Sequence, residues 1–314
     1  MLDGVSILQL TQLQEITGPH CNPYLTIAVS GTLAAKTLNF AVTDISGGLP
    51  HDRVLSTIDY LRHLHHALPN QVKVHDRPVD FVFQAEDVPV NIPSVSWETR
   101  RSWDQIILVP DLYYFTSQGY EDAFIGTTPW NMRQNKIIWR GSTTGLFYQR
   151  LEDIDQLPRY QLCVGVSGLG DIADVGLNAV VQALDSEQEA LIHERLTREN
   201  LFKPFIPMHD MAQYRYILDI DGNSNSWNFI MKLRLGCCVL RVESEWQQWF
   251  WPRLSPWVHY VPLARDLSNI GEIVEWCLSH EAECEEISRQ GMEFAQTMRF
   301  SDEMRIAASN IFTS

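Results

Sequence analysis

Two loops of this 314-residue chain combine glycine with hydroxyl and amide side chains directly after predicted strands. The first, residues 141–145, reads GSTTG and follows a predicted strand at 136–139. The second, residues 221–228, reads DGNSNSWN and follows a predicted strand at 216–220. Such loops expose backbone N–H groups at the carboxyl end of a strand, where phosphate groups bind. From the residues alone, an ordinary tight turn is the alternative for the first loop.

An acidic pair spaced D-x-D, Asp219 and Asp221, opens the second loop. Two carboxylates beside a diphosphate repel it unless a cation lies between them, so one hypothesis is a metal site. The other is that Asp221 shapes the loop by hydrogen bonding its own backbone, as an Asx turn does.

The elements that position these loops alternate between strand and helix, which predicts an α/β chain with two parallel-sheet domains. The predicted strands lie at 25–29, 39–42, 79–83, 106–109, 136–139, 173–177, 216–220 and 239–242. The predicted helices lie at 53–68, 158–164, 187–199 and 227–235, and again from 267 to the end, with Ser268 and Ser301 as N-caps. Gly126, Thr127 and Pro129 interrupt the pattern and predict a linker near 119–135.

The composition limits the class of protein. A chain of 314 residues with 45% hydrophobic content can bury two cores of roughly 150 residues each. A net charge of −15 without an arginine-rich run argues against wrapping a nucleic acid. The first residues carry neither a signal peptide nor a membrane span, which predicts a cytoplasmic protein without a transmembrane segment. The cysteines lack metal-ligand spacing, and Cys237 and Cys238 are predicted to pack as small apolar side chains.

Several motifs in fixed order carry a family resemblance. Between Tyr214 and Pro262 the chain reads YRY, DIDGNSNSW, CCVLRV and EWQQWFWPRLSPWVHYVPL, and residues 138–145 read IWRGSTTG. With these motifs it resembles glycosyltransferase family 90, which includes capsule-associated and lipopolysaccharide-modifying transferases and protein O-glucosyltransferases. The resemblance implies a GT-B fold, in which two Rossmann-type domains face each other across a cleft. It places an acceptor-side domain at 1–125, a nucleotide-sugar-binding domain at 136–285 and C-terminal helices at 286–314 that pack back toward the first domain.

The resemblance implies that a UDP-sugar donor binds both loops of the second domain. In relatives, an arginine after the R-G-S segment reaches the donor, and here Arg150 stands closest by spacing while Arg159 is the alternative. Relatives often carry another arginine where this chain has Asn228, which leaves Lys232 as a further candidate to neutralise UDP. Glu245 is expected at the ribose, or else as a helix-start glutamate. The residues expected to contact the donor are Arg140, Gly141, Ser142, Thr143, Arg150, Arg159, Asp221, Gly222, Asn223, Asn225, Ser226, Asn228 and Glu245.

In the first domain, Asp87 lies in the D-x-P context in which relatives carry the general base. A turn-forming aspartate is the alternative reading, and Glu86 is a neighbouring competitor. Trp97, Pro110 and Tyr113 are expected on the acceptor side. The aromatic residues Trp246, Trp249, Phe250, Trp251 and Trp257 are predicted to pack inside the protein rather than to stack on sugar.

The sequence therefore predicts an inverting glycosyltransferase that moves a hexose or pentose from a UDP-sugar to a hydroxyl of a glycan or other acceptor. Surface polysaccharide or glycan synthesis is the expected setting. UDP-sugar is the co-substrate, and neither a cofactor nor a metal is expected. A binding protein with a decayed donor site is the alternative, motivated by the missing arginine at Asn228. A metal-dependent transferase that uses Asp219 and Asp221 is a third hypothesis.

Overall fold

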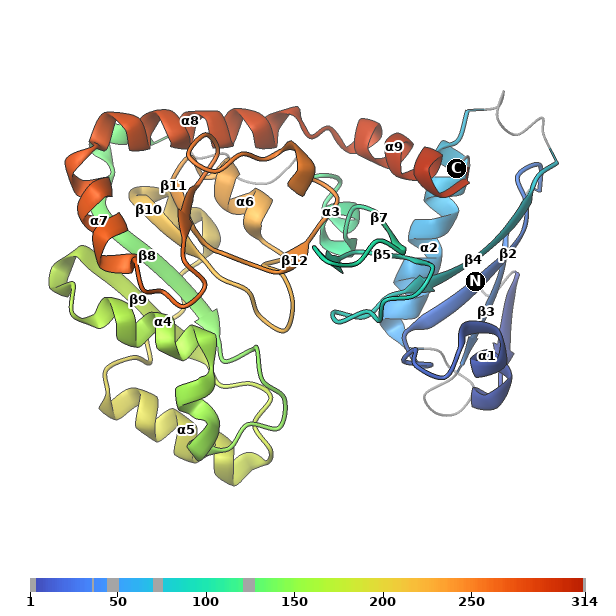
Figure 1. Cartoon of the computed structure of the whole chain (residues 1–314), viewed down its shortest axis with the longest axis horizontal. Helices are drawn as coiled ribbons and strands as arrows, with labels where there is room; N and C mark the ends of the chain where they lie inside the picture. The colour runs from blue at the N-terminus through green and yellow to red at the C-terminus, as the bar shows by residue number, and fades with distance from the viewer. Residues whose placement is uncertain (1–3, 36, 44–50, 70–75, 121–127, 313–314) are drawn as a thin grey trace. The chain divides into compact units, whose positions relative to one another are not determined.

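The computed structural model describes residues 4–35, 37–43, 51–69, 76–120 and 128–312 (Figure 1). The chain divides into two compact units. Unit 1 comprises Met1–Asp122, Glu245–Pro252 and Met298–Ser314, and unit 2 comprises Ala123–Ser244 and Arg253–Thr297. The predicted α/β class and helical C-terminal part are confirmed. Gly126 and Thr127 of the predicted linker lie outside the described residues.

Unit 1 contains a six-stranded sheet. In spatial order its strands are β1 (Val5–Leu8), β3 (Asn39–Thr43), β2 (Thr26–Thr32), β4 (Pro78–Gln84), β5 (Ser94–Ser96) and β7 (Ile106–Leu108). The prediction of an all-parallel sheet is wrong here, because β2 runs antiparallel to both β3 and β4. Only residues 33–38 connect β2 to β3, and a parallel crossover needs a dozen residues or more. The strands β4, β5 and β7 are parallel, so their carboxyl ends share one edge.

The helices of unit 1 come from distant parts of the chain. They are α1 (Leu10–Thr17), α2 (Asp52–Ala67), α3 (Leu112–Thr116) and the C-terminal α9 (Phe300–Phe312). Helix α9 packs against α2, as Figure 1 shows, and the Phe312 ring meets the His65 ring of α2 at 5.6 Å between centroids. The two-residue strands β6 (Thr99–Arg100) and β12 (Trp246–Gln247) pair antiparallel, which ties the segment 245–252 to this unit.

Unit 2 has the parallel sheet that the sequence predicts. Its spatial order is β13 (Val261–Leu263), β11 (Cys238–Val242), β10 (Tyr214–Asp219), β8 (Gln134–Ser142) and β9 (Ala173–Ala179), with every neighbouring pair parallel. Chain order starts at β8, moves outward to β9 and then returns to β10 on the other side of β8. The strand order therefore reverses between β8 and β10, which makes this pair the topological switch point of the sheet.

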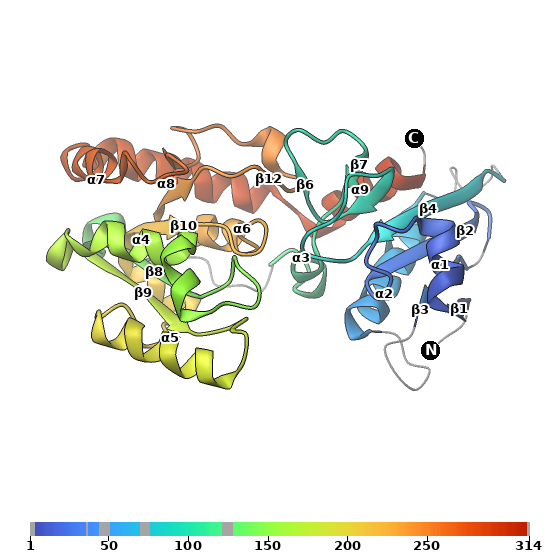
Figure 2. The same ribbon diagram turned by 60° about the horizontal axis from the view of Figure 1, so that its bottom comes forward.

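The helices of unit 2 are α4 (Pro158–Ser167), α5 (Ser186–Arg198), α6 (Phe229–Arg234), α7 (Ile270–Ser279) and α8 (Glu281–Thr297). Single turns of 3-10 helix lie at Trp130–Met132, Leu151–Gln156, Gly170–Ile172 and Met208–Gln213, and one more at Trp251–Arg253 joins the two units. Helix α8 packs along α6 and β11, which Figure 2 shows from a second direction. All five residues of β11 are buried, as expected for an inner strand of a covered parallel sheet. Cys237 and Cys238 are buried.

Candidate functional site

The two glycine-containing loops meet at the switch point of unit 2. The loop after β8 and the loop after β10 are joined by a hydrogen bond from the Gly145 N–H to Asn223 Oδ1 of 3.1 Å. A Cβ atom placed on Gly222 would stand only 2.9 Å from Thr144 Oγ1, so the loops pack closely because Gly222 has no side chain. Ligands of parallel sheets bind where such loops diverge at the carboxyl ends of the strands. The structure thus brings together the two loops that the sequence predicts.

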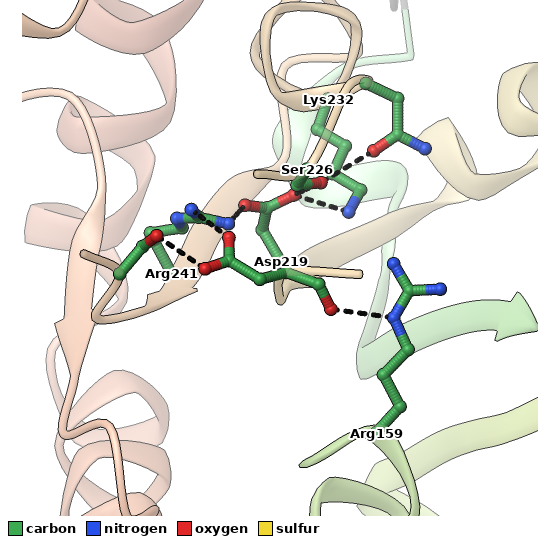
Figure 3. A network of polar contacts seen from close by, with 8 residues as sticks. Arg159, Asp219, Ser226, Lys232 and Arg241 are labelled. Atoms are coloured by element: carbon green, nitrogen blue, oxygen red, sulfur yellow. Dashed lines mark hydrogen bonds and ion pairs between the residues drawn. The ribbon is translucent and has the colours of Figure 1, made fainter. Parts of the chain in front are cut away.

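Arg159, in the first turn of α4, bridges these loops. Its Nε donates to the carbonyl oxygen of Asp221 at 2.8 Å, and its Nη1 donates to the carbonyl oxygen of Ser142 at 3.1 Å. Figure 3 shows the guanidinium reaching the loop that follows β10. Burial lowers the pKa of Arg159 to about 10, so the side chain stays cationic at neutral pH. The site therefore contains a fixed positive charge between two loops with exposed backbone.

The other predicted arginines lie elsewhere in unit 2. The Arg150 side chain is 55% exposed, and its Nη1 lies 3.8 Å from Glu152. Arg140 is held by protein acceptors, with its Nη2 2.6 Å from Asp174 Oδ1 and its Nε donating to the Pro204 carbonyl. Because those bonds hold the start of β9 to β8, we correct the expected donor role of Arg140 to a structural one.

Below the second loop, the carboxylate of Asp219 is fully buried and neutralised (Figure 3). Its Oδ1 accepts from Lys232 Nζ at 2.6 Å and from Ser226 Oγ at 2.5 Å, and its Oδ2 accepts from Arg241. Burial alone would raise the pKa of Asp219, but the charges of Lys232 and Arg241 outweigh it and hold the pKa below its usual value. Lys232 therefore serves Asp219, and its expected role of neutralising UDP is corrected.

Asp221 is tied to the same network. Its Oδ1 accepts from Arg241 Nη2 at 2.6 Å and its Oδ2 accepts from Ser244 Oγ at 2.5 Å. Arg241 thus joins both carboxylates of the D-x-D pair, and Asp221 holds the loop through Arg241 and Ser244 rather than through the predicted Asx turn. Within the described ranges, no group of three or more His, Cys, Asp or Glu side chains is arranged to hold a metal ion. Sequence reasoning did not select Arg241, although a basic residue in an otherwise apolar strand was a visible signal.

Several of the residues that were predicted to contact the donor have buried side chains. The Thr143 hydroxyl donates to the Val181 carbonyl at 2.8 Å and accepts from the Val181 N–H at 2.9 Å, so this buried side chain is fully occupied. Asn225 and Ser226 are buried, and Ser226 Oγ also contacts Asn228 Oδ1 at 3.0 Å. The Ser226 side chain therefore supports the loop, and the donor contacts expected of Asn225 and Ser226 stay predictions. The partly exposed residues of the two loops are Gly141, Ser142, Thr144, Gly145, Asp221, Gly222, Asn223, Trp227 and Asn228.

An acidic cluster lies at the shared edge of β4 and β7 in unit 1. Asp87 follows β4, and its Oδ1 forms an ion pair of 2.7 Å with Arg53 Nη1 of α2. Beside it, burial raises the pKa of Glu86 to about 7, and Glu86 Oε1 is buried without a hydrogen-bond partner among the described residues. Asp111 follows β7, and burial raises the pKa of its carboxyl to about 7 as well. The cluster contains Asp87 and Glu86 as predicted, and it adds Asp111.

Asp111 was missed by sequence reasoning. It is the N-cap of α3, where its Oδ1 accepts from the Tyr114 N–H at 2.8 Å while its Oδ2 accepts from Gln248 Nε2 at 3.0 Å. Its position directly after Pro110, at the end of a predicted strand, was the available signal.

The predicted acceptor-side aromatics differ in exposure. Trp97 is fully buried and packs against Phe83 and Tyr60 at 4.6 and 5.0 Å between ring centroids. Its expected contact with an acceptor is therefore corrected to a role in the core of unit 1. Pro110 is buried and Tyr113 is 59% exposed.

The structure also locates Glu245 and the tryptophan-rich segment that follows it. Glu245 belongs to unit 1, with its carboxylate 3.7 Å from Arg100, and its contact with a ribose remains a prediction. Trp246 and Phe250 are buried, in agreement with the packing prediction. Trp257 is 45% exposed, so the packing prediction is wrong for that residue.

A five-stranded parallel sheet with glycine loops and a bridging arginine at its switch point is an arrangement that suits a phosphate-bearing ligand. Residues 171–306 match the family model described as Glycosyl transferase family 90. This match confirms the resemblance carried by the motifs, and over this segment the chain is similar to glycosyltransferase family 90.

Curated relatives agree with this assignment. Uncharacterized protein 179R of Invertebrate iridescent virus 6 is 28% identical over 187 residues, which are 54% of this chain and 16% of that protein. Protein O-glucosyltransferase 1 of Mus musculus is 30% identical over 119 residues, which are 37% of this chain and 30% of that protein. The matched segments thus span less than a third of either relative.

Solved structures include Anabaena Alr3699/HepE in complex with UDP-glucose, with a TM-score of 0.47 and 9% identity over 73% of this chain and 65% of that one. TarM has a TM-score of 0.43 and 12% identity over 68% of this chain and 40% of that one. Of the helices that the structure describes, none is both long and apolar enough to cross a membrane.

Proposed function

We propose that this chain is an inverting glycosyltransferase of the GT-B kind, which binds a UDP-sugar on unit 2 and transfers the sugar to a hydroxyl of a glycan or other acceptor. The observation that carries the proposal is the Arg159 bridge between the loops after β8 and β10. A diphosphate needs N–H donors and a fixed cation, and the presence of Arg159 beside two loops at the switch point supports such a site.

The loops and Arg159 would hold the donor. The N–H groups of Thr143, Gly145 and Gly222 donate within the protein, so those of Thr144 and Asn223 are the proposed backbone contacts to the phosphates. The Nη2 group of Arg159 would supply a charge-assisted bond worth about 1.5–3 kcal/mol. As the sugar leaves, negative charge grows on the β-phosphate of UDP, and Arg159 stabilises that charge. Arg159 also places a cation beside these loops, although the arginine that relatives often carry is absent at Asn228.

Asp87 would be the general base. Its carboxylate accepts the proton of the acceptor hydroxyl while that oxygen attacks the anomeric carbon from the face opposite UDP, and the bond to UDP breaks. The ion pair with Arg53 fixes the position of the Asp87 carboxylate after β4. Glu86 is the alternative base, because its pKa of about 7 suits proton transfer near neutral pH.

The donor sugar is proposed to be glucose or a related hexose or pentose, since the mouse relative is named a protein O-glucosyltransferase. Synthesis of a surface polysaccharide or another glycan is the proposed setting. The second candidate function is a nucleotide-sugar-binding protein without turnover, and the missing arginine at Asn228 favours it.

Two measurements test the function. In a thermal-shift screen, UDP should stabilise the full chain more than GDP or CMP does. At 100 times its dissociation constant, UDP should add about 2.7 kcal/mol to the free energy of unfolding. UDP release from UDP-sugars with a panel of glycan acceptors then measures turnover. Equal shifts by all three nucleotides would contradict the donor assignment, whereas UDP binding without turnover on any acceptor would support the binding protein.

Asp87→Asn tests the base. The amide keeps the size of the side chain but removes the proton acceptor, so transfer should fall by about 10²–10⁴ while UDP affinity is retained. The matched control is Glu86→Gln. Full activity of the Asp87 variant together with a similar loss in the Glu86 variant would move the base to Glu86.

A further inference from the structure

We propose that unit 2 carries a second saccharide-binding site, distinct from the proposed donor site. It is a cavity of about 430 Å³ with aromatic walls formed by Trp257 and Trp276, and with Glu283, Ile287 and Gln290 of α8 also lining it. The volume lies within the range of small-ligand pockets. No residue of the two donor loops lines this cavity.

Trp257 is held in an unfavourable state. Its φ angle is 63°, in the left-handed region that large side chains rarely adopt, and its side chain is 45% exposed. Two hydrogen bonds keep the loop in place, from the Trp257 N–H to the Tyr260 carbonyl at 2.7 Å and from the Ser255 N–H to His259 Nδ1 at 3.0 Å. The fold therefore presents a large apolar ring to solvent at a strained position, and such positions concentrate at ligand sites.

The second wall is also fixed in advance. The Trp276 ring meets the Trp257 ring at 79°, with centroids 4.9 Å apart, and stacks on the His280 ring at 12° with centroids 4.8 Å apart. The His280 ring is itself held by a contact of 3.0 Å between its Nδ1 and the Trp276 carbonyl oxygen. Two aromatic walls set nearly at right angles before binding lower the entropy that a ligand must lose.

The polar side chains of the cavity select the ligand. Glu286 is neutralised by Arg289, with Nε–Oε2 and Nη2–Oε1 contacts of 2.8 and 2.5 Å, and it also accepts from Gln290 Nε2 at 2.6 Å. Glu283 makes no ion pair with any side chain in the described ranges. The Glu283 carboxylate can accept hydrogen bonds from the hydroxyl groups of a ligand.

A pyranose ring has the required shape and polarity. Its C–H face is apolar and gains dispersion contacts on a tryptophan ring, while its hydroxyl groups at the edge can donate to Glu283. The choice of a saccharide among such ligands rests on the proposed function. A glycan acceptor that also binds at this cavity would have a higher effective concentration at the site of sugar transfer.

The experiment uses the full chain with maltotriose and cellotriose as neutral probes, followed by isothermal titration and by tryptophan fluorescence. We expect millimolar binding of at least one trisaccharide. Trp257→Ala should weaken it at least tenfold, and Glu283→Gln should weaken it severalfold. The matched control is Phe205→Ala, which removes another exposed aromatic side chain of unit 2 that does not line the cavity. Trp257→Phe, which keeps a flat ring, should retain part of the affinity and serves if the alanine variant does not fold.

Arg159→Ala separates this inference from the proposed function. Saccharide binding that survives in Arg159→Ala while UDP binding falls supports two sites. Saccharide binding lost in Arg159→Ala places the sugar at the donor loops and overturns the inference alone. The inference also fails if neither trisaccharide binds the wild-type chain, or if Trp257→Ala binds as wild type does. A third outcome also overturns the inference: the chain binds no saccharide but self-associates, and Trp257→Ala abolishes that self-association. The cavity at Trp257 would then be a contact between two copies of the chain.

Discussion

At the scale of single residues, two arginines that the sequence leaves as alternatives have different surroundings. Arg159 donates to the carbonyl groups of Ser142 and Asp221, whereas Arg150 lies on the surface with a distant partner at 3.8 Å. A solvent-exposed arginine contributes little to a distant site because water and salt screen its charge. Arg159 is therefore the residue on which donor binding should depend.

We expect Arg159→Ala to weaken UDP-sugar binding about ten- to a hundredfold, because it removes a charge-assisted bond worth about 1.5–3 kcal/mol. Isothermal titration with UDP-glucose measures the effect. Arg150→Ala is the matched control and should bind as wild type does. A larger loss in the Arg150 variant would reverse the assignment.

Asp111 gives unit 1 a pH dependence. Its folded pKa of about 7 lies above the unfolded value of roughly 3.9, so the folded state binds a proton more tightly than the unfolded state. The stability that this group contributes is present below about pH 4, falls as the pH rises toward 7 and is lost above it.

Between pH 5 and pH 8 the free energy of unfolding should fall less in Asp111→Asn than in the wild type, by on the order of 1–3 kcal/mol. The fall that is left in the variant is attributed to Glu86, whose pKa is also raised. Denaturant unfolding at pH 5, 6, 7 and 8 provides the comparison. Asp104→Asn, at an exposed aspartate of the same unit, is the control. Parallel profiles for wild type and Asp111→Asn would contradict the assignment.

At the scale of elements, the donor site depends on how closely two loops approach. Gly222 allows this approach, because a Cβ atom there would stand 2.9 Å from both Arg159 Nη2 and Thr144 Oγ1. Both of those atoms belong to side chains, so they would move before the backbone does.

Gly222→Ala should therefore displace Arg159 and weaken UDP binding severalfold while the fold is retained. Gly165→Ala in α4 is the matched control, since a Cβ atom there meets nothing within 4 Å. Titration of both variants with UDP tests the point. Unchanged UDP affinity in Gly222→Ala would show that the contact between the loops is not needed for donor binding.

At the scale of the whole molecule, the two units differ in how the chain builds them. Unit 2 contains the parallel sheet, whereas unit 1 includes α9 from the C-terminal end of the chain. The Phe312 ring of α9 contacts Phe81 of β4 and His65 of α2 at 6.0 and 5.6 Å between centroids. The end of the chain is thus part of the core of unit 1.

Phe312→Ala should destabilise unit 1 by about 1–3 kcal/mol because it removes a buried aromatic ring, while UDP binding to unit 2 is retained. Hydrogen exchange of α2 compared with α6 reports on the two units separately. Ile306→Ala, at a half-exposed position of α9, is the control. Faster exchange in α6 as well would contradict the independence of the two units.

The sequence by itself determines the α/β class, the two loops that follow strands and the resemblance to a family. These features depend on local periodicity, on glycine and hydroxyl residues after strands and on short motifs, all of which are read within a few residues of each other. The strands at 39–42 and 25–29 were both predicted, but their antiparallel pairing was not, since pairing direction depends on how the strands are connected in space.

Only the tertiary structure decides which side chains meet. The sequence does not distinguish Arg159 from Arg150. In the structure only Arg159 of these two bridges the loops, through Asp221 and Ser142, which lie 62 and 17 residues away in the chain. Lys232 of α6 and Arg241 of β11 neutralise Asp219 of β10. Trp97, which was expected to contact an acceptor, is buried, whereas Trp257, which was expected to pack inside the protein, is 45% exposed. The reason is physical: burial and ion pairing arise from packing between elements distant in the chain, and no local pattern encodes those distances.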